Sequence, residues 1–392
     1  MSHIAPQNFA ELEQLMAQIV ANKTAVSVVA QGTKTQIGAP TLCETTLDVS
    51  GLSGIIDYEP EELIITAHTA TPLADMEAAL SERGQMLAFE PPHFDGLYGT
   101  PSTGSIGGAL MANLSGPRRL SQGAARDFLL GFQGVSGRGM SFRSGSKVVK
   151  NVTGYDLSKL LCGSFGTLAV IDEITLKTLP APETSLSLII ANPKLDLVAQ
   201  AARAALQTAY EPSAVAIIPQ GMHDLAQNAA LAIIRLEGVG ISVTDRFEKL
   251  QAALSEFGHT DKMAEAESTA LWRAIRDVSL LRDKTAQIWR ISCAPSEGPA
   301  LYEALANNGD VKGFFDWAGG LLWLSCHDEA SHQTIREALV AHGGGHATLM
   351  RASDEMRRIV PVFEPLAPAL AQLNKRVQEA FDPYGLLNPG RL

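Results

Sequence analysis

The most informative part of the sequence is the loop Thr103-Gly-Ser-Ile-Gly-Gly108, which leads into the apolar run Ala109–Leu114. A second loop with similar features, Gln31-Gly-Thr-Lys-Thr35, follows a strand predicted over Ala25–Ala30. Both loops offer successive backbone N–H groups, and glycine lets the backbone approach an anion closely. Each loop taken singly is more typical of an ordinary tight turn, so the residues alone leave both interpretations open.

Glycine is concentrated around the loop at residues 103–108. The chain has 34 glycines in 392 residues, and 15 of them lie between Gly96 and Gly166. Backbone freedom of this kind is typical of a loop-rich ligand site. The composition therefore favours a binding site in the first half of the chain.

Length and composition predict a large globular protein of about two or three domains. The chain is 46% hydrophobic and 19% charged, which is enough for a core that needs no disulfide or metal. Its net charge of −11, without a basic cluster, disfavours a nucleic acid partner. The amino terminus lacks a positively charged region, and no apolar run approaches the roughly 18 residues of a membrane span. We therefore expect a cytoplasmic protein without a signal peptide.

The cysteines and the familiar nucleotide motifs exclude several classes of site. Cys43, Cys162, Cys293 and Cys326 are scattered, with no Cys-x-x-Cys, so we expect reduced thiols and neither a zinc site nor an iron–sulfur cluster. The sequence also lacks a Gly-x-Gly-x-x-Gly after a strand, a P-loop and a Gly-x-Ser-x-Gly elbow. A nicotinamide-binding Rossmann domain, a P-loop enzyme and an α/β-hydrolase are all poor fits.

The pattern of the chain changes at Pro180-Ala-Pro182, which we interpret as a domain boundary. Beyond it glycine becomes rarer, and predicted strands alternate with long helices. This order predicts an α+β domain over residues 183–355, with an open sheet that has helices on one face. Residues 356–392 form a compositionally separate segment, and no internal repeat is visible in the sequence.

A family resemblance rests on motifs that occur in a fixed order. The first seven are Glu90-Pro-Pro-His93, Thr103-Gly-Ser-Ile-Gly-Gly108, Leu114-Ser-Gly-Pro-Arg-Arg119, Arg126-Asp-Phe-Leu-Leu-Gly131, Lys150-Asn-Val-Thr-Gly-Tyr-Asp156, Gly163-Ser-Phe-Gly-Thr-Leu168 and Lys177-Thr-Leu-Pro180. Four more are Trp289-Arg-Ile-Ser292, Phe315-Asp-Trp-Ala-Gly-Gly320, Gly344-Gly-His-Ala-Thr348 and Asn388-Pro-Gly-Arg391. With these motifs the sequence resembles the FAD-binding subunits of bacterial glycolate oxidase. Those subunits belong to the flavoprotein superfamily typified by vanillyl-alcohol oxidase and p-cresol methylhydroxylase.

The resemblance implies an α+β fold with three parts. Residues 1–182 would form a FAD-binding domain of the p-cresol methylhydroxylase type, with FAD between two α+β subdomains. Residues 183–355 would form an α+β cap with an open sheet. Residues 356–392 would be a carboxy-terminal segment that returns to the FAD-binding domain.

The resemblance also implies which residues lie near FAD. They are Gln31, Gly32, Thr33, Lys34, Thr35, Pro91, Thr103, Gly104, Ser105, Ile106, Gly107, Gly108, Ser115, Gly116, Pro117, Arg118, Lys150, Asn151, Tyr155, Asp156, Gly163, Gly166, Leu168 and Asn388. The two glycine-containing loops would bracket the diphosphate, residues 163–168 would line the adenosine side, and Asn388 would return to the flavin ring. Many family members bond FAD covalently through a histidine in the loop that corresponds to residues 31–35. The loop here has no histidine, so the resemblance implies a dissociable cofactor, and His93 is more typical of a structural residue.

Catalytic residues are not evident from the sequence, and the weak candidates are Arg290, His346 and Arg351. Arg290 stands between apolar residues of a predicted strand, where a charge needs a partner. An ion pair within the cap and a bound substrate are the two explanations. Arg118 and Arg119 either recognise an anion or form a surface pair. No metal site is expected.

The resemblance implies a subunit of a glycolate dehydrogenase complex that oxidises glycolate, a small 2-hydroxy acid, to glyoxylate. Its partners would be a sister FAD-containing subunit and an iron–sulfur subunit, and through them it would attach to the periphery of the inner membrane. Two alternatives stay open. One is a self-sufficient FAD-dependent oxidase or dehydrogenase of another alcohol or hydroxy acid, and the other is a non-catalytic FAD-carrying assembly subunit.

Overall fold

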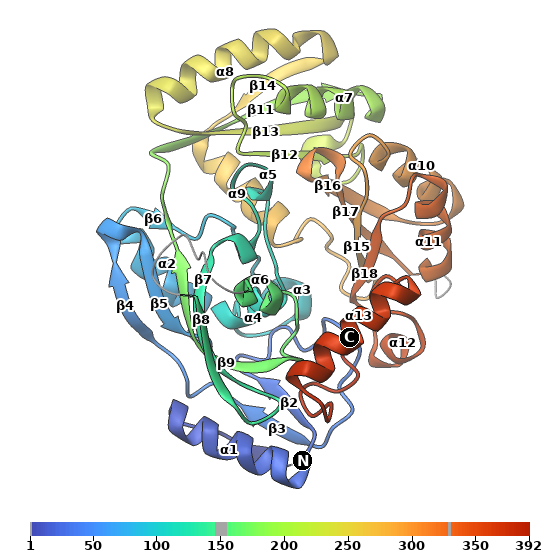
Figure 1. Ribbon diagram of the computed structural model, residues 1–392. Coiled ribbons are helices and arrows are strands. Elements are labelled where there is room, and N and C mark those ends of the chain that lie inside the picture. Colours follow the sequence, from blue (N-terminus) through green and yellow to red (C-terminus); the bar gives the residue numbers. More distant parts are fainter. Residues whose placement is uncertain (1, 146–154, 328–330) are drawn as a thin grey trace. The chain divides into compact units, whose positions relative to one another are not determined.

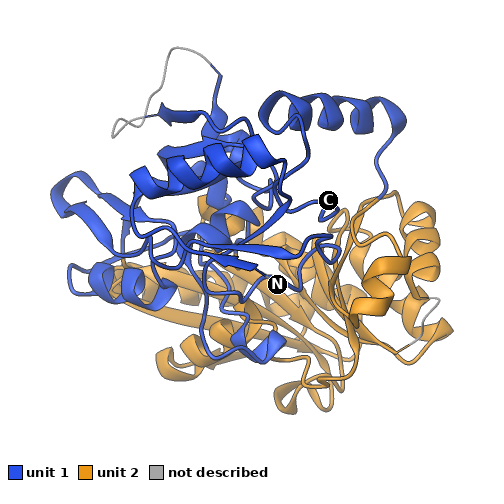
Figure 2. Cartoon of the chain, turned by 90° about the horizontal axis from the view of Figure 1, so that it is seen from below, with its two compact units in different colours: residues 1–115, 124–180, 365–392 blue, residues 116–123, 181–364 orange. Residues whose placement is uncertain are grey.

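The computed structural model describes residues 2–145, 155–327 and 331–392. These residues form two compact units (Figure 2). Unit 1 comprises Met1–Ser115, Ala124–Pro180 and Pro365–Leu392, and unit 2 comprises Gly116–Gly123 and Ala181–Glu364. Both units combine helices and sheets (Figure 1), which confirms the predicted α+β class.

The main sheet of unit 1 is antiparallel and, within the described residues, has the strand order β4-β5-β9-β7-β8. Its strands are β4 (Ile55–Glu59), β5 (Ile64–His68), β7 (Leu129–Ser136), β8 (Ser141–Gly145) and β9 (Ala169–Lys177). The helices α2 (Leu73–Ser81), α4 (Ile106–Met111) and α6 (Leu157–Leu161) contribute fully buried side chains to its core. Smaller elements of the unit are α3 (Asp95–Tyr98), β6 (Gln85–Met86) and β10 (Leu179–Pro180), of which the last two pair with each other.

A second, parallel sheet of unit 1 has the order β1-β3-β2, with β1 at Ser2–Ile4, β3 at Thr45–Asp48 and β2 at Val26–Val29. Helix α1 (Phe9–Asn22) packs on it through Leu12, Met16 and Ile19, which recur at helical spacing. The Asn8 side chain caps this helix by accepting a hydrogen bond from the N–H of Glu11. The apolar pattern of the sequence predicts both α1 and β2.

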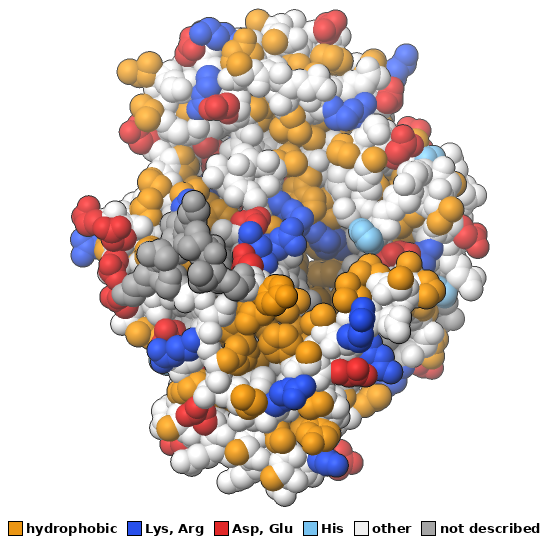
Figure 3. Space-filling view, viewed as in Figure 1, with side chains coloured by type: hydrophobic (Ala, Val, Ile, Leu, Met, Phe, Trp, Pro, Cys, Tyr) orange, Lys and Arg blue, Asp and Glu red, His pale blue; other side chains and the backbone are white. Residues whose placement is uncertain are grey.

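The carboxy-terminal residues also belong to unit 1. The N–H of Val26 donates to the carbonyl of Leu386 (2.8 Å), and the N–H of Asn388 donates to the carbonyl of Val26 (2.9 Å). The preceding helix, α13 (Pro368–Phe381), has no fully buried residue, and its Leu370 and Leu373 are each 46% exposed. Hydrophobic side chains accordingly reach the surface around α13 (Figure 3). None of the helices in the described ranges is both long and apolar enough to cross a bilayer.

Unit 2 is built on an eight-stranded sheet with the order β14-β11-β13-β12-β16-β17-β15-β18, counted over the described residues. Its strands are β11 (Thr184–Asn192), β12 (Ala214–Ile218), β13 (Ala230–Gly238), β14 (His259–Met263), β15 (Gln287–Ser292), β16 (Lys312–Asp316), β17 (Leu321–Cys326) and β18 (His346–Arg351). Its helices are α5 (Arg119–Gln122), α7 (Leu195–Leu206), α8 (Gly240–Leu254), α9 (Glu265–Arg276), α10 (Gly298–Asn308), α11 (Ser331–Ala341) and α12 (Asp354–Ile359).

The element order of unit 2 shows a repeat that the sequence does not reveal. The series β11-α7-β12-β13-α8-β14 and the series β15-α10-β16-β17-α11-β18 both follow the βαββαβ order. Each half has the same spatial order of strands, and β12 meets β16 where the halves join. The repeat lies in the topology, which many unrelated hydrophobic patterns satisfy, so it leaves no visible period in the residues.

The expectation of helices on one face of this sheet is wrong for α9. The Ser187 hydroxyl of β11 bonds the Ser268 hydroxyl of α9 (2.8 Å) and accepts from the Trp272 indole of α9 (2.8 Å). Helices α7 and α8 lie on the other side of the same strands (Figure 1). Helix α9 connects the two halves and fills the second face. The prediction failed because the amphipathic pattern of a helix does not specify which face of a sheet it covers.

Candidate functional site

The first glycine-containing loop, residues 31–35, leaves β2 in a tight turn. Gly32 adopts a φ of 69°, and its carbonyl accepts hydrogen bonds from both the N–H and the hydroxyl of Thr35 (3.4 and 3.0 Å). The side chains of Thr33 and Lys34 are buried, with only 4% and 8% of their surface exposed. The loop therefore buries a hydroxyl and an ammonium group directly after a strand.

The second loop, residues 103–108, is held by the turn that follows β5. The Gly104 carbonyl accepts from the N–H of Leu73 (2.8 Å), and the N–H of Gly107 donates to the carbonyl of Thr69 (2.8 Å). Ser105 caps the short helix α4 with its side chain. These bonds hold the loop in place against the main sheet of unit 1.

The two loops contact each other, and glycine is required at the contact. A Cβ on Gly104 would lie 2.4 Å from both the Lys34 Nζ and the Thr33 Oγ1, and Gly104 also has a φ of 97°. The other two glycines differ in role. A Cβ on Gly107 would lie 2.5 Å from the Thr69 side chain, whereas one on Gly108 would meet the Lys34 stem at 3.4 Å. Gly107 therefore serves packing, and Gly104 and Gly108 make room around Lys34.

Lys34 carries a buried charge that no carboxylate of the described residues neutralises. Its Nζ donates to the Thr33 hydroxyl at 3.3 Å. Burial lowers the pKa of Lys34 from 10.5 to about 8, because the ammonium loses its hydration. A buried cation without a counterion destabilises the fold unless an anion compensates it. This arrangement suits an anionic ligand.

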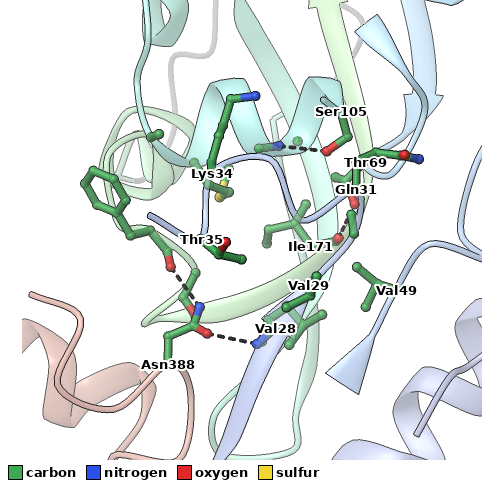
Figure 4. Close-up of a pocket in the computed structure, with 18 of the residues that line it drawn as sticks. Val28, Val29, Gln31, Lys34, Thr35, Val49, Thr69, Ser105, Ile171 and Asn388 are labelled. Atoms are coloured by element: carbon green, nitrogen blue, oxygen red, sulfur yellow. Dashed lines mark hydrogen bonds between the residues drawn. The ribbon is translucent and has the colours of Figure 1, made fainter. Parts of the chain in front are cut away.

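These side chains line a cavity within unit 1 (Figure 4). Both loops contribute to the wall, together with Phe165, Gly166, Asn388 and Arg391. The buried ammonium of Lys34 and the close contact of the two glycine loops fit the diphosphate group of a dinucleotide such as FAD.

Asn388 joins three parts of the cavity wall. Its Oδ1 accepts from the N–H of Val28 (2.8 Å), and its Nδ2 donates to the carbonyls of Phe165 (2.9 Å) and Gly166 (3.3 Å), as Figure 4 shows in part. Its backbone is left-handed, with a φ of 46°, which asparagine tolerates better than most residues. The amide is thus engaged with backbone groups, and Asn388 positions the wall of the cavity.

Arg391 belongs to this wall and was missed by the sequence reasoning. Its guanidinium donates to the Lys34 carbonyl, and its own carbonyl accepts from the N–H of Ala39 (3.2 Å). A Cβ on Gly38 would lie 2.8 Å from that same carbonyl. The motif Asn388-Pro-Gly-Arg391 could have indicated Arg391 as a site residue, since a guanidinium beside a glycine suits the binding of an anion.

Several predicted residues lie outside the cavity wall. Pro91 is buried elsewhere in unit 1, and the nearby His93 pairs with Glu77 (3.0 Å), as expected for a structural histidine. The Ser115 hydroxyl accepts from the N–H of Ala125 (2.9 Å). Tyr155 is 89% exposed.

The residues around α6 have local structural roles. Asp156 caps the helix by accepting from the N–H of Lys159 (3.1 Å). The N–H of Gly163 donates to the carbonyl of Met111 (3.0 Å), and Leu168 is part of the hydrophobic core. Of the segment 163–168, Phe165 and Gly166 line the cavity. Lys150 and Asn151 lie outside the described residues.

Gly116, Pro117 and Arg118 fall in unit 2, although the sequence places them inside the expected FAD-binding domain of residues 1–182. Arg118 makes a bidentate ion pair with Glu237 of β13 (2.9 and 2.6 Å). Arg235 approaches the same carboxylate at 3.3 Å. The guanidinium of Arg118 thus anchors the segment 116–123 to the sheet of unit 2.

The weak catalytic candidates do not form one site. The Arg351 guanidinium is buried and donates to the carbonyls of Asp283 and Ala286. His346 is exposed and lies five residues away along β18, which corresponds to about 17 Å at roughly 3.3 Å per residue. These two side chains cannot act together on one small substrate. Arg290 makes no ion pair with any described residue and instead lies over the ring of Trp317.

Sequence comparisons identify relatives over nearly the whole chain. Residues 3–145 match the family described as FAD binding domain. The glycolate oxidase subunit GlcE of Escherichia coli (strain K12) is 36% identical over 386 residues, covering 97% of this chain and 96% of that protein. The glycolate oxidase subunit GlcD of Bacillus subtilis (strain 168) is 24% identical, covering 99% of this chain and 88% of that protein. These matches confirm the prediction of a FAD-binding flavoprotein.

Solved structures agree on the fold. The structure of p-cresol methylhydroxylase with substrate bound has a TM-score of 0.74 at 14% identity, over 99% of this chain and 88% of that one. An alkyldihydroxyacetonephosphate synthase also has a TM-score of 0.74, at 13% identity, over 100% of this chain and 77% of that one. At these identities the likeness concerns the fold alone.

Proposed function

The chain belongs to the family of FAD-binding glycolate oxidase subunits, and we propose that it holds FAD in the cavity of unit 1 as one subunit of a glycolate-oxidising complex. The complex would convert glycolate to glyoxylate. Other relatives are named as D-lactate and D-2-hydroxyglutarate dehydrogenases, so the family acts on 2-hydroxy acids.

The main support for the proposed FAD site is the buried charge of Lys34, which no carboxylate of the described residues compensates. The ammonium is buried beside two backbone loops that only glycine allows to meet. A diphosphate would supply the missing negative charge, and the Thr33 hydroxyl would share its oxygens with the Lys34 ammonium. Bound FAD would supply the acceptor for a hydride taken from the substrate carbon.

The cofactor would be bound without a covalent link. The loop at residues 31–35 has no histidine, and His93 is engaged with Glu77. The purified chain should therefore be yellow and release FAD on acid precipitation. Flavin that stays on the denatured polypeptide would contradict the proposed mode of binding.

Electrons would leave through partner subunits. No group of three or more metal-ligating side chains occurs among the residues described, and an iron–sulfur cluster requires cysteines gathered at one place. We propose a sister FAD-containing subunit and an iron–sulfur subunit as partners, which would also provide any attachment to the inner membrane. The protein would otherwise be cytoplasmic.

The decisive experiment is purification of the tagged chain from its native host. We expect a second flavoprotein and an iron–sulfur protein to copurify, and the complex to reduce an artificial acceptor when glycolate is added. Deletion of the gene for this chain in the host should remove the glycolate-dependent activity, and expression of the chain from a plasmid should restore it. A chain that purifies alone and oxidises another alcohol unaided would instead support a self-sufficient enzyme. A chain that is needed for assembly but holds a flavin that glycolate never reduces would be a non-catalytic subunit.

A further inference from the structure

A buried carboxylate of unit 1 directly follows a residue of the cavity wall. Asp172 of β9 has only 2% of its surface exposed, and the preceding Ile171 lines the cavity. The Nδ1–H of His68, the last residue of β5, donates a hydrogen bond to the Asp172 Oδ1 at 2.7 Å. A buried carboxylate needs such a donor, because it has lost its hydration. The pair therefore ties the end of β5 to β9.

A β-bulge gives the Asp172 side chain its direction. The register between β7 and β9 shifts between Gln133 and Gly134, so Asp172 has no counterpart among the described residues of β7. An extra residue of this kind re-aims a side chain, and bulges are common next to functional sites. Here the bulge turns the Asp172 carboxylate towards His68.

The residue after His68 connects this bulge to the loop at residues 103–108. The N–H of Thr69 donates to the Asp172 carbonyl (2.6 Å), and its hydroxyl donates to the Ile171 carbonyl (2.6 Å). The Thr69 carbonyl in turn accepts from the N–H of Gly107 (2.8 Å). Thr69 and Ile171, both labelled in Figure 4, line the cavity together with Gly107. A shift of Thr69 would therefore move the loop as well.

We propose that His68 and Asp172 are positioning residues for the FAD site, because their hydrogen bond fixes the turn at Thr69 and thereby the loop at residues 103–108. The described residues that line the cavity do not include either member of the pair, so both act through Thr69. A loop that is already ordered binds its ligand more tightly, since less free energy is spent on ordering it. The inference rests on the proposed function for its ligand and extends the site to a pair behind Thr69.

The test compares three variants of His68 in the full-length, FAD-free chain. In His68→Asn the amide nitrogen can take the place of Nδ1, in His68→Gln it reaches only the position of Nε2, and His68→Leu has no donor. FAD affinity is measured by fluorescence titration. We expect His68→Leu and His68→Gln to bind FAD about tenfold more weakly than the wild type, and His68→Asn to stay within about twofold of it.

The matched control is His93→Leu, which removes another histidine–carboxylate pair of unit 1. His93 bonds Glu77 at 3.0 Å, and neither residue lines the cavity in the described part of the chain. His93→Leu should lower the melting temperature without changing the FAD affinity. A loss of FAD affinity that only accompanies lower stability would therefore appear in both His93→Leu and His68→Leu.

Amide hydrogen exchange follows the loop without relying on FAD. In the FAD-free chain the N–H of Gly107 should exchange about tenfold faster in His68→Leu than in the wild type, and His68→Asn should restore the wild-type rate. Wild-type FAD affinity in His68→Leu, equal affinities in His68→Asn and His68→Gln, or equal losses in His68→Leu and His93→Leu would overturn the proposal. If His68→Leu does not fold, the comparison of His68→Asn with His68→Gln decides. A wild-type chain that binds no FAD would instead refute the proposed function, and the exchange at Gly107 would still show whether the pair holds the loop.

Discussion

Replacing Lys34 by methionine tests the cofactor site most directly, because it removes a charge and keeps a side chain of similar length. The pKa of Lys34 is about 8 in the folded protein and 10.5 in its ordinary state. At roughly 1.4 kcal/mol per unit, burial of the ammonium costs the empty protein about 3 kcal/mol at pH 7. Lys34→Met should therefore raise the unfolding free energy of the FAD-free protein by up to about that amount.

The pH dependence gives the sign of this effect. Below pH 8 the ammonium is charged in both states, so the full cost is present. Between pH 8 and 10.5 the unfolded chain binds more protons than the folded one, so the stability of the wild type rises with pH. The advantage of the FAD-free variant should shrink over this interval and vanish near pH 10.5.

FAD affinity should change in the opposite direction. Loss of a charge-assisted hydrogen bond to a phosphate costs about 1.5–3 kcal/mol, so Lys34→Met should bind FAD about tenfold to a hundredfold more weakly at pH 7. The wild-type affinity should fall as pH rises above 8, because the ammonium then loses its proton, whereas the affinity of the variant should not change there. Binding of FAD by the wild type near pH 8.5 should take up protons.

The assay is calorimetric titration of the FAD-free chain with FAD at pH 7, 8 and 9, together with urea unfolding. Lys375→Met is the control, since Lys375 is 74% exposed on α13 in the same unit. An FAD affinity that Lys34→Met leaves unchanged across this pH range would show that Lys34 does not face the diphosphate. It would also remove the main argument for the location of the cofactor site.

Three further predictions address the neighbouring residues. Gly104→Ala should weaken FAD binding and lower the stability of the fold, because its Cβ would lie 2.4 Å from the Lys34 Nζ. Gly54→Ala is the control, since Gly54 also has a positive φ but has open space around its Cβ position, and this variant should keep its flavin. Equal flavin content in the two purified variants would contradict the prediction. Asn388→Gly should lower the unfolding free energy by about 3 kcal/mol in urea titrations, because the backbone groups of Val28, Phe165 and Gly166 lose their hydrogen-bond partner. An effect below about 1 kcal/mol would show that the Asn388 amide does not hold the cavity wall in place. In an anaerobic titration, glycolate should reduce the flavin of the isolated FAD-loaded chain slowly or not at all. The reason is that the Arg351 guanidinium, a candidate to hold the substrate carboxylate, already donates to backbone carbonyls. Rapid loss of the flavin absorbance without a partner subunit would place the catalytic site on this subunit.

Local features of the fold were predictable because they depend on residues close together in the chain. Helix α1 follows from an apolar residue every three or four positions. The loop at residues 31–35 was evident because glycine and hydroxyl residues directly follow a buried strand. The glycine-rich block likewise indicated a ligand site before any contact was known.

Contacts between distant residues were not predictable in the same way. Arg118 pairs with Glu237, 119 positions later, and this ion pair assigns the segment 116–123 to unit 2. The residues near Arg118 in the chain do not indicate whether its guanidinium binds a carboxylate of the protein or the phosphate of a ligand. The βαββαβ repeat was hidden for a related reason, since two halves with the same topology need share only a buried face and not a residue pattern.

The amino-acid sequence alone identifies the two glycine loops and the α+β class, because backbone freedom and hydrophobic period act over a few residues. Its ordered motifs carry the resemblance to the FAD-binding family. The tertiary structure decides which groups those loops meet. It shows that the ammonium of Lys34 is buried without a carboxylate partner among the described residues, that Gly107 packs on Thr69, and that Asn388 holds the cavity wall. Burial and charge neutralisation depend on residues brought together across up to 360 positions of the chain, and no local pattern encodes them.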